Sequence, residues 1–559
     1  EVKGMAPGAQ LLVIKAMNPQ GEAPVDLLIE AMDYAVAHGA SVINLSFGYQ
    51  SSGRGDESLV REAQRLESNY GVTFIAASGN QGPGLSTVTA PGDGDGILGV
   101  GAYVSPSQYA QQYGYQVAQE GLWYFSGMGP RRDGHLAPDL VAPGAAIAPT
   151  SGIGGSYYGL IEGTSVASPI VAGAAAVLRQ AAQWLGQRPP AAVYRLALER
   201  GTRPVDHATL PEAGRGLLDI ERAWEQMVEL TFGSPGAASA GDWLTASTYN
   251  QDFGVGKEGL YARSFLPGSI PFVIGNQSSK NRVINWSTDA SWIKLGAEST
   301  AIPAHGTRIL PLDYQVPASP GLYSGRILGT LPGEKEAAIE LLVTAIRPES
   351  LAPNNGYRAD LQGELPAGAW HRYFLRVDGG ASKLKVTMKV AQDASGNFLG
   401  RVRLWLYKPN GSNQYVSDFI GLAPPGQQAQ GQVDFQVSAP EPGTWEVVVY
   451  SSAGLSNWDK LSSHYQLQVA LEGASPPPEI GSGPGAAVAA GKLIEVLPQK
   501  LRPSSVGPTF LTIQVWDQAT LTPVSCVLEI NGKTYWARRG RVTLPWAEAD
   551  GQLKLRIGV

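Results

Sequence analysis

The residues in this chain that could do chemistry are concentrated in the heptad Gly-Thr-Ser-Val-Ala-Ser-Pro at 163–169, which a run of small and apolar residues follows. Such a run predicts a buried helix with the Ser165 hydroxyl in its first turn. The N–H groups there have no partner within the helix, and the helix dipole adds partial positive charge. A serine at that point can attack a carbonyl while its own N–H stabilises the oxyanion that forms. The heptad therefore predicts a nucleophile rather than a helix-capping serine.

The elements that must position this serine lie in the first 227 residues, where short apolar runs alternate with segments of helical apolar spacing. The expected strands are 11–14, 42–45, 72–77 and 97–100, and the expected helices are 25–38 and 57–70. This alternation predicts an α/β fold with a parallel sheet and helices on both faces. In such sheets the active site lies at the carboxyl ends of the strands. Ser46 and Asn80 each follow a predicted strand, so both are expected at that edge.

Further stretches accompany the heptad in a fixed order. They are Gly-Met-Ala-Pro-Gly-Ala at 4–9, Ser46-Phe47-Gly48, Ala-Ala-Ser-Gly-Asn at 76–80 and Ala142-Pro143-Gly144. With them the chain resembles the subtilase (subtilisin-like) serine peptidases over residues 1 to about 227. Within that family, the stretches 79–88, 99–106 and 129–134 are similar to tripeptidyl peptidase II. The resemblance implies a serine peptidase, either an endopeptidase or an exopeptidase that releases tripeptides.

The resemblance also implies roles for individual residues. Ser165 would be the nucleophile and Asn80 would donate a side-chain N–H to the oxyanion. The two walls of the substrate cleft would be Ser46, Phe47 and Gly48 on one side and Ala77, Ser78 and Gly79 on the other. We expect both walls to be exposed strand edges that pair with an extended peptide. Gly48 and Gly79 would leave room for a substrate side chain.

A serine nucleophile needs a general base and a group that orients the base. In subtilases the triad runs Asp, His, Ser along the chain. His38 closes a predicted helix and His135 lies in a polar loop where we expect it to be solvated. His305 begins a His-Gly-Thr that imitates the family motif, but it lies downstream of Ser165. The catalytic aspartate and histidine are therefore expected ahead of Glu1, and the 559-residue chain alone is expected to be inactive.

Two alternatives stay open at the level of sequence. The first is a catalytically dead subtilase scaffold whose β domains bind protein or glycan. The second concerns the mode of cleavage, because tripeptidyl peptidase II binds the substrate's amino terminus with acidic residues, one of them directly after the Ser-containing wall. Tyr49 stands at that place here, and Glu22 lies near the other acidic site.

Beyond about residue 228 the helical spacing gives way to short alternating strands separated by turn residues, which is typical of β-sandwiches. After the C-terminal part of a subtilisin-like peptidase domain at 1–227, we expect a fibronectin III-like β-sandwich at 228–347, a jelly-roll-like β-sandwich at 348–473, a Pro/Gly-rich linker at 474–491, and a small incomplete β module at 492–559.

Composition limits the partners. The formal net charge is −6 and there is no basic stripe, so nucleic-acid binding has no support. We find no apolar run of transmembrane length, and the single cysteine, Cys526, cannot form an intrachain disulfide. Asp93 and Asp95 lie in a Gly-Asp-Gly-Asp-Gly stretch that is typical of a polar loop. We therefore expect no cofactor, no metal and no membrane partner.

The expected partner is a peptide or protein substrate, and the resemblance leaves open a homo-oligomer formed through the β domains. The low charge fraction, 16% of residues, and the Gly/Pro-rich linker fit a secreted enzyme. The resemblance to tripeptidyl peptidase II points instead to the cytosol. The sequence leaves the location open and favours a secreted or extracellular protein slightly over a cytoplasmic one.

Overall fold

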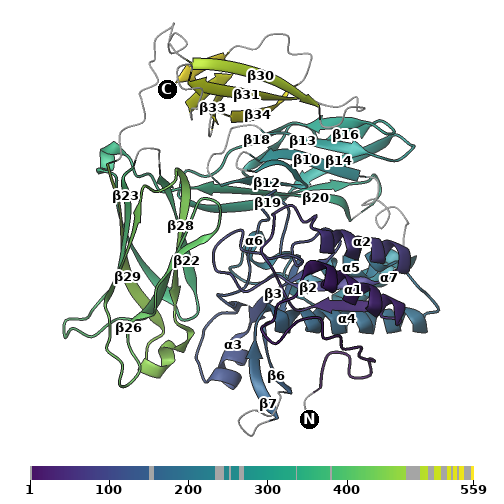
Figure 1. Cartoon of the computed structure of the whole chain (residues 1–559), viewed down its shortest axis with the longest axis horizontal. Coiled ribbons are helices and arrows are strands. Elements are labelled where there is room, and N and C mark those ends of the chain that lie inside the picture. Colours follow the sequence, from purple (N-terminus) through teal and green to yellow (C-terminus); the bar gives the residue numbers. More distant parts are fainter. Residues whose placement is uncertain are drawn as a thin grey trace.

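The computed structural model of the chain describes residues 3–149, 157–232, 244–250, 253–263, 270–334, 336–377, 381–473, 492–500, 509–517, 526–530, 533–537, 541–546 and 555–558. An α/β domain comes first and all further domains are built of β-strands, with the two larger β-sandwiches lying against the α/β domain (Figure 1). The predicted linker at 474–491 lies outside the described residues.

The α/β domain is built on a seven-stranded sheet in the order β1-β2-β3-β5-β9-β8, with β4 paired to β3. The strands are β1 (Val42–Leu45), β2 (Thr73–Ala77), β3 (Leu98–Val104), β4 (Gly121–Leu122), β5 (Leu140–Pro143), β8 (Thr202–Arg203) and β9 (Leu217–Leu218). Strands β1, β2, β3, β5 and β9 run parallel, whereas β4 and β8 are antiparallel to their neighbours. The parallel sheet agrees with the prediction from alternating apolar runs.

Helices cover both faces of this sheet. The α/β domain contains α1 (Val25–Ala37), α2 (Ser58–Tyr70), α3 (Pro106–Gln108), the π-helical turn η1 (Tyr109–Tyr113), α4 (Thr164–Trp184), α5 (Ala191–Arg200), α6 (Leu210–Ala213) and α7 (Ile220–Phe232). On β2, Phe74 and Ala76 pack with α1 and α2, whereas Ile75 packs with α4, α5 and α7. Successive residues of a strand point to opposite faces, so a strand covered on both sides is apolar throughout.

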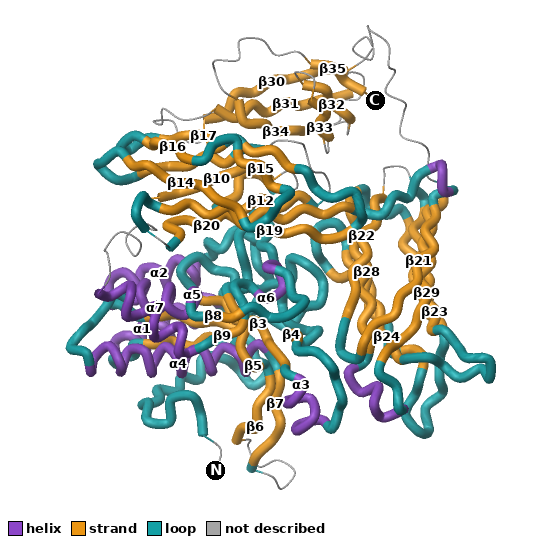
Figure 2. The backbone as a smooth tube through the Cα atoms, turned by 180° about the vertical axis from the view of Figure 1, so that it is seen from behind, coloured by secondary structure: helices purple, strands orange, loops and turns teal. Residues whose placement is uncertain are grey.

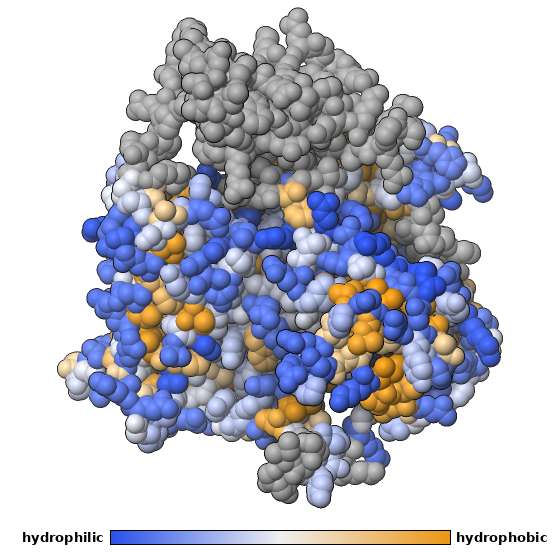
Figure 3. Space-filling model, in the orientation of Figure 1, coloured by the Kyte–Doolittle hydropathy of each residue, from blue (hydrophilic) through white to orange (hydrophobic). Residues whose placement is uncertain are grey.

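Two sequence expectations for this domain were wrong, the strand at 11–14 and the lack of an apolar run of transmembrane length. Residues 11–14 form no strand, and Leu11 and Val13 are each 86% exposed, because β1 pairs only with β2 in the described structure and no strand lies beside this run. The predicted boundary at about residue 227 falls within α7, which continues to Phe232 and packs on the α/β core. Helix α4 has the length and hydropathy of a membrane span, but it is a core helix with nine buried residues. Exposed apolar side chains over the helical part of this domain are visible in Figure 3.

A β-hairpin leads into α4. It consists of β6 (Ala145–Pro149) and β7 (Tyr158–Glu162), and it projects from the domain beside α3 (Figure 2). Gly163 follows the hairpin directly and donates its N–H to Gly144 O at 2.9 Å. The start of α4 is thereby tied to the end of β5.

The first sandwich has one sheet in the order β11-β10-β13-β17 and a second in the order β12-β20-β19-β14-β16, with β15 and β18 paired separately. Its strands are β10 (Leu244–Asn250), β11 (Gly254–Lys257), β12 (Gly259–Ala262), β13 (Phe272–Asn276), β14 (Arg282–Thr288), β15 (Ile293–Leu295), β16 (Ser299–Ile302), β17 (Thr307–Leu310), β18 (Leu312–Tyr314), β19 (Gly321–Thr330) and β20 (Ala337–Arg347). Buried aromatic residues, among them Phe272 and Trp286, fill its core.

The second sandwich pairs a sheet β21-β29-β23-β27 with a sheet β22-β28-β24-β25, to which β26 is added. Its strands are β21 (Arg358–Pro366), β22 (Trp370–Val377), β23 (Lys383–Val390), β24 (Arg401–Tyr407), β25 (Asn413–Val416), β26 (Ile420–Gly421), β27 (Gln432–Ser438), β28 (Gly443–Ser451) and β29 (Ser462–Glu472), with 3-10 turns η3 (Pro353–Asn355) and η4 (Ala453–Trp458). Trp445 is fully enclosed at its centre.

The last described strands form two three-stranded sheets, β30-β31-β34 and β33-β32-β35. They are β30 (Lys492–Lys500), β31 (Thr509–Asp517), β32 (Cys526–Ile530), β33 (Lys533–Ala537), β34 (Arg541–Trp546) and β35 (Leu555–Gly558). Strand β34 contacts β10 of the first sandwich, so this module lies on the side away from the α/β domain (Figures 1 and 2).

Candidate active site

Ser165 is the second residue of α4, and Gly163 is the N-cap residue of that helix. The N–H groups of Val166 and Ala167 both point to Gly163 O, at 3.0 and 3.3 Å. Gly163 has φ +145°, a backbone conformation that favours glycine. The first turn therefore presents the Ser165 hydroxyl and its N–H together at the positive end of the helix dipole.

Asn80 follows β2 and lies against the start of α4. Its Oδ1 accepts hydrogen bonds from Thr164 N at 3.0 Å and from Thr164 Oγ1 at 2.9 Å. The same Thr164 hydroxyl accepts the N–H of Gly79 at 3.1 Å. Because both donors engage Oδ1, the amide nitrogen Nδ2 of Asn80 remains free to donate elsewhere.

Three groups converge on one position in front of Ser165. That position is where a Cβ atom would stand if residue 163 carried one. It lies 2.8 Å from Ser165 Oγ, 3.2 Å from Asn80 Nδ2 and 3.6 Å from Ser165 N. A hydroxyl and two N–H donors around one point is the arrangement that acyl transfer requires, since the donors can stabilise negative charge beside the nucleophile.

Ser46 supports the backbone of the nucleophile. Its hydroxyl donates to Ser165 O at 2.9 Å and accepts from Asn44 Nδ2 at 2.8 Å. In a regular helix that carbonyl would accept the N–H of residue 169, but Pro169 has none. The hydroxyl at the carboxyl end of β1 thus replaces the missing helical hydrogen bond. Asn44 also accepts the hydroxyl of Ser168, which adds a second link between β1 and α4.

The two predicted walls of the cleft differ from each other. Within the described chain, Ser46, Phe47 and Gly48 make no backbone hydrogen bond, and Ser46 and Gly48 are exposed. This wall is free to pair with an extended peptide. The side chain of Phe47 turns away from the edge and packs on the core formed by α1 and α2.

The expectation of an exposed edge at Ala77, Ser78 and Gly79 was wrong. Ala77 and Ser78 are buried, and Ser78 N donates to Val100 O at 2.9 Å. The carbonyls of Ser78 and Gly79 accept the N–H groups of Thr89 and Gly127 at 2.9 and 2.7 Å. Ala77 ends β2, and the backbone groups of Ser78 and Gly79 just beyond it are already paired with β3, Thr89, Gly127 and Thr164.

The glycines of the two walls face a single side chain. A Cβ atom on either Gly48 or Gly79 would clash with Thr89, whose Oγ1 is buried and has no hydrogen-bond partner. Thr89 precedes the cis peptide Ala90–Pro91. The space next to both glycines is therefore already occupied by Thr89, contrary to the expectation that it stays open for a substrate side chain.

None of the six histidines forms a hydrogen bond or ion pair with Ser165 in the described chain. His38 is the C-cap of α1, and its Nδ1 lies 2.8 Å from Tyr34 O. His305 is exposed in the turn between β16 and β17, in the first sandwich. Among the residues that the structure describes, no histidine contacts Ser165.

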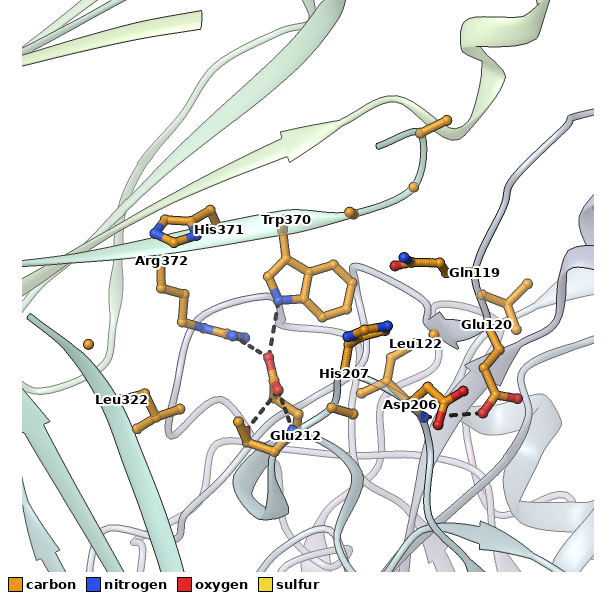
Figure 4. A pocket seen from close by; sticks show the side chains of 18 of the residues that line it. Gln119, Glu120, Leu122, Asp206, His207, Glu212, Leu322, Trp370, His371 and Arg372 are labelled. Carbon is orange, nitrogen blue, oxygen red and sulfur yellow. Dashed lines mark hydrogen bonds and ion pairs between the residues drawn. The ribbon is translucent and has the colours of Figure 1, made fainter. Parts of the chain in front are cut away.

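His207 and His371 line a cavity of about 320 Å³ where the α/β domain meets both sandwiches. They lie beside Trp370, and the cavity walls come from all three domains (Figure 4). His464 lies 3.7 Å from Glu364 on the outer sheet of the second sandwich. These histidines belong to the β domains or to their junction with the α/β domain.

His135 is only partly solvated, since its side chain is 28% exposed. Its Nδ1 is buried without a hydrogen-bond partner and lies 3.9 Å from Glu258 Oε2 of the first sandwich. Burial, together with the positive charge of Arg131, lowers the pKa of the imidazole. The loop around His135 is covered because the first sandwich docks on it.

Sequence reasoning missed the residues that orient the site, above all Thr164 and Thr89. Thr164 lies inside the heptad, and a hydroxyl next to the nucleophile was a usable signal. Thr89 carried no local signal, because its place between two glycines depends on how the loop after Asn80 returns to the cleft.

The fold and the site together define a serine-type peptidase domain of the subtilisin kind. Residues 1–208 match the model of the Subtilase family (Peptidase S8), and this domain of the chain belongs to that family.

Individual relatives extend the likeness into the β domains. The chain is similar to pyrolysin of Pyrococcus furiosus, with 29% identity over 482 residues that make up 80% of this chain and 32% of pyrolysin. It is also similar to tripeptidyl-peptidase 2 of Caenorhabditis elegans, with 26% identity over 413 residues, or 69% of this chain and 29% of that protein.

A crystal structure of tripeptidyl peptidase 2 superposes with a TM-score of 0.66 at 18% identity, covering 94% of this chain and 45% of that chain. That likeness extends the shared fold through both sandwiches. The chain spans about a third or less of the length of these two curated relatives.

Proposed function

We propose that this chain supplies the nucleophile and the oxyanion donors of a serine peptidase that cleaves peptide bonds through an acyl-enzyme. The supporting observation is the convergence of Ser165 Oγ, Ser165 N and Asn80 Nδ2 on one position beside Gly163. Ser165 Oγ adds to the carbonyl carbon and gives its proton to a base, while the carbonyl oxygen becomes the oxyanion. Collapse expels the amine, which takes up that proton, and water then hydrolyses the ester.

The base and the group that orients it are proposed to come from a histidine and an aspartate encoded ahead of Glu1, in the chain order of subtilases. The open edge at β1 and the exposed run at 11–14 support this proposal. An adjoining segment that pairs with this edge would cover apolar side chains such as Leu11 and Val13. It would also approach Ser46 and Ser165, which lie at the same end of the sheet.

The experiment that tests the proposal uses the full-length protein and a fluorophosphonate probe. Wild-type protein should be labelled and should hydrolyse a protein substrate, whereas Ser165→Ala should do neither. Ser107→Ala removes an exposed hydroxyl elsewhere in the domain and should behave as wild type. If full-length protein with Ser165 intact is neither labelled nor active, the chain is a catalytically dead scaffold with protein- or glycan-binding β domains.

The mode of cleavage depends on the end of the cleft near Tyr49. Its phenol is buried, and burial together with the charges of Glu57 and Asp93 raises the pKa of Tyr49 to about 12. A neutral hydroxyl thus stands at the position directly after the exposed wall. Cleavage of amino-terminally acetylated peptides would identify an endopeptidase, and release of tripeptides from unblocked peptides alone would identify an exopeptidase.

A further inference from the structure

The loop that begins at Asn80 leaves the cleft and returns to it. It returns at Thr89, whose N–H donates to Ser78 O at 2.9 Å, so its two ends lie side by side. Between these ends, Gly82 N donates to Phe125 O at 2.9 Å. Residues 81–88 then reach the junction between the α/β domain and the two sandwiches. The far end of the loop is therefore joined to Asn80 by a few residues of backbone.

Leu85, at the far end of the loop, is completely buried. Its side chain packs with Tyr261 and Ile346 of the first sandwich and with Phe374 of the second. A Cβ atom on Gly84 would stand 2.6 Å from the ring of Tyr407 on β24, so that ring lies directly on the loop backbone. The far end of the loop is therefore enclosed by residues of the β domains.

The backbone at Leu85 is held by a buried carboxylate. Leu85 N donates to Glu446 on β28, at 3.2 Å from each carboxylate oxygen. Glu446 is 0% exposed and is contacted by Arg263 Nη2 at 3.1 Å and by Arg372 Nε at 3.2 Å. Two guanidinium groups compensate the carboxylate, which is the condition under which a buried charge is tolerated.

Arg372 extends this network back to the α/β domain. Its Nη2 donates to Pro83 O at 2.7 Å, and its Nη1 forms an ion pair with Glu212 of α6. Trp370 Nε1 donates to the same carboxylate at 3.1 Å, and both side chains point from β22 toward Glu212 (Figure 4). A chain of alternating charges thus crosses all three domains, in the order Arg263, Glu446, Arg372, Glu212.

We propose that Glu446 is a positioning residue for the oxyanion hole, acting through Leu85 and the loop 81–88 on the side chain of Asn80. The inference rests on the proposed function, in which Asn80 donates to the oxyanion. Oxyanion donors act only if they are held in place before the reaction. Within the α/β domain, Thr164 holds Oδ1 of Asn80, and the loop is fastened by Ser86 N and Thr87 N, which donate to Gly129 O and Met128 O at 3.1 and 2.8 Å. Glu446 adds a further contact at the far end of the loop, from 361 residues away along the chain.

The first test is Glu446→Ala in the full-length protein. Because the oxyanion forms only in the transition state, we expect kcat to fall about tenfold or more while KM changes less than about twofold. Glu446→Gln keeps an acceptor oxygen for Leu85 N and should recover part of the loss. Glu364→Ala removes an exposed carboxylate of the same sandwich and should leave both constants unchanged.

The second test asks whether the effect passes through Asn80. If it does, adding Glu446→Ala to Asn80→Ala should cost little beyond the loss from Asn80→Ala alone. Leu85→Ala removes the anchor of the loop and leaves all four charges in place, so it serves where Glu446→Ala does not fold, and it should give the same non-additivity. Full additivity in both cycles would overturn the proposal.

The third test separates this inference from the proposed function. Hydrogen exchange of the backbone amides in 81–88 reports the order of the loop without any activity. Faster exchange in Glu446→Ala or Leu85→Ala, but not in Glu364→Ala, supports the role of Glu446. If Asn80→Ala leaves kcat unchanged, the oxyanion assignment fails and the positioning proposal falls with it. If Asn80→Ala lowers kcat while exchange in 81–88 is unaltered in both variants, only the role of Glu446 is refuted.

Discussion

The substitution Gly163→Ala tests the geometry of the site most directly. An alanine Cβ would stand 2.8 Å from Ser165 Oγ and 3.2 Å from Asn80 Nδ2, at the point that the oxyanion donors surround. A carbon atom there excludes the substrate's oxygen from both donors. Losing one such donor costs about 3–4 kcal/mol in transition-state energy. The backbone at φ +145° adds strain, of order 1–3 kcal/mol in general.

We therefore expect Gly163→Ala to lower kcat by at least about 10²–10³-fold, the loss also expected for Asn80→Ala. The assay is steady-state hydrolysis by the full-length protein, with thermal unfolding measured in parallel. Gly186→Ala is the matched control, because Gly186 follows the other end of α4 at φ +70° and its Cβ would meet nothing within 4 Å. It introduces backbone strain without filling the site. A kcat within about twofold of wild type for Gly163→Ala, with Asn80→Ala impaired, would refute the geometric argument.

Two further predictions concern the support of the site and its surroundings. Ser46→Ala removes the hydroxyl that donates to Ser165 O. The net contribution of such a hydrogen bond is about 0.5–1.5 kcal/mol, so kcat should fall by up to roughly tenfold, whereas Ser46→Thr should retain most activity. Equal rates for wild type and both variants would contradict this. Burial raises the pKa of Asp93 to about 7, so the folded protein binds a proton at this carboxyl more tightly than the unfolded chain does. The protonated carboxyl therefore adds to the free energy of unfolding below about pH 4, and this addition is lost as the pH rises through about 7. Asp93→Asn should remove this decline. If the free energy of unfolding depends on pH in the same way for wild type and variant from about pH 4 to 8, Asp93 does not cause the decline.

The parts of the fold that could be predicted depend on short stretches of sequence. A strand covered on both faces is apolar, so β2 was evident from the run at 72–77. The run at 42–45 forms β1, although Asn44 within it is exposed. The run at 11–14 has the same composition but no strand beside it, and it stays exposed. Apolar composition specifies that a segment can be buried, and only the neighbouring strands determine whether it is.

Some features of the candidate site could also be predicted from the sequence, and others could not. The heptad around Ser165 predicts a nucleophile at a helix start, because helix geometry fixes what lies in the first turn. The direction of the Asn80 amide could not be predicted, since it depends on Thr164, 84 residues further along the chain. His135 was expected in solvent, but its loop is covered by the first sandwich.

By itself, the sequence determined the family of the first domain and the change from an α/β domain to β-sandwiches, and it predicted the position of the nucleophile. These properties follow from residue types within a few positions of one another. Only the tertiary structure brings the hydroxyl of Ser46 to the carbonyl of Ser165, and the carboxylate of Glu446 to the N–H of Leu85. A hydrogen bond needs two groups within about 3 Å, and for residues far apart in sequence the path of the whole chain decides whether they meet.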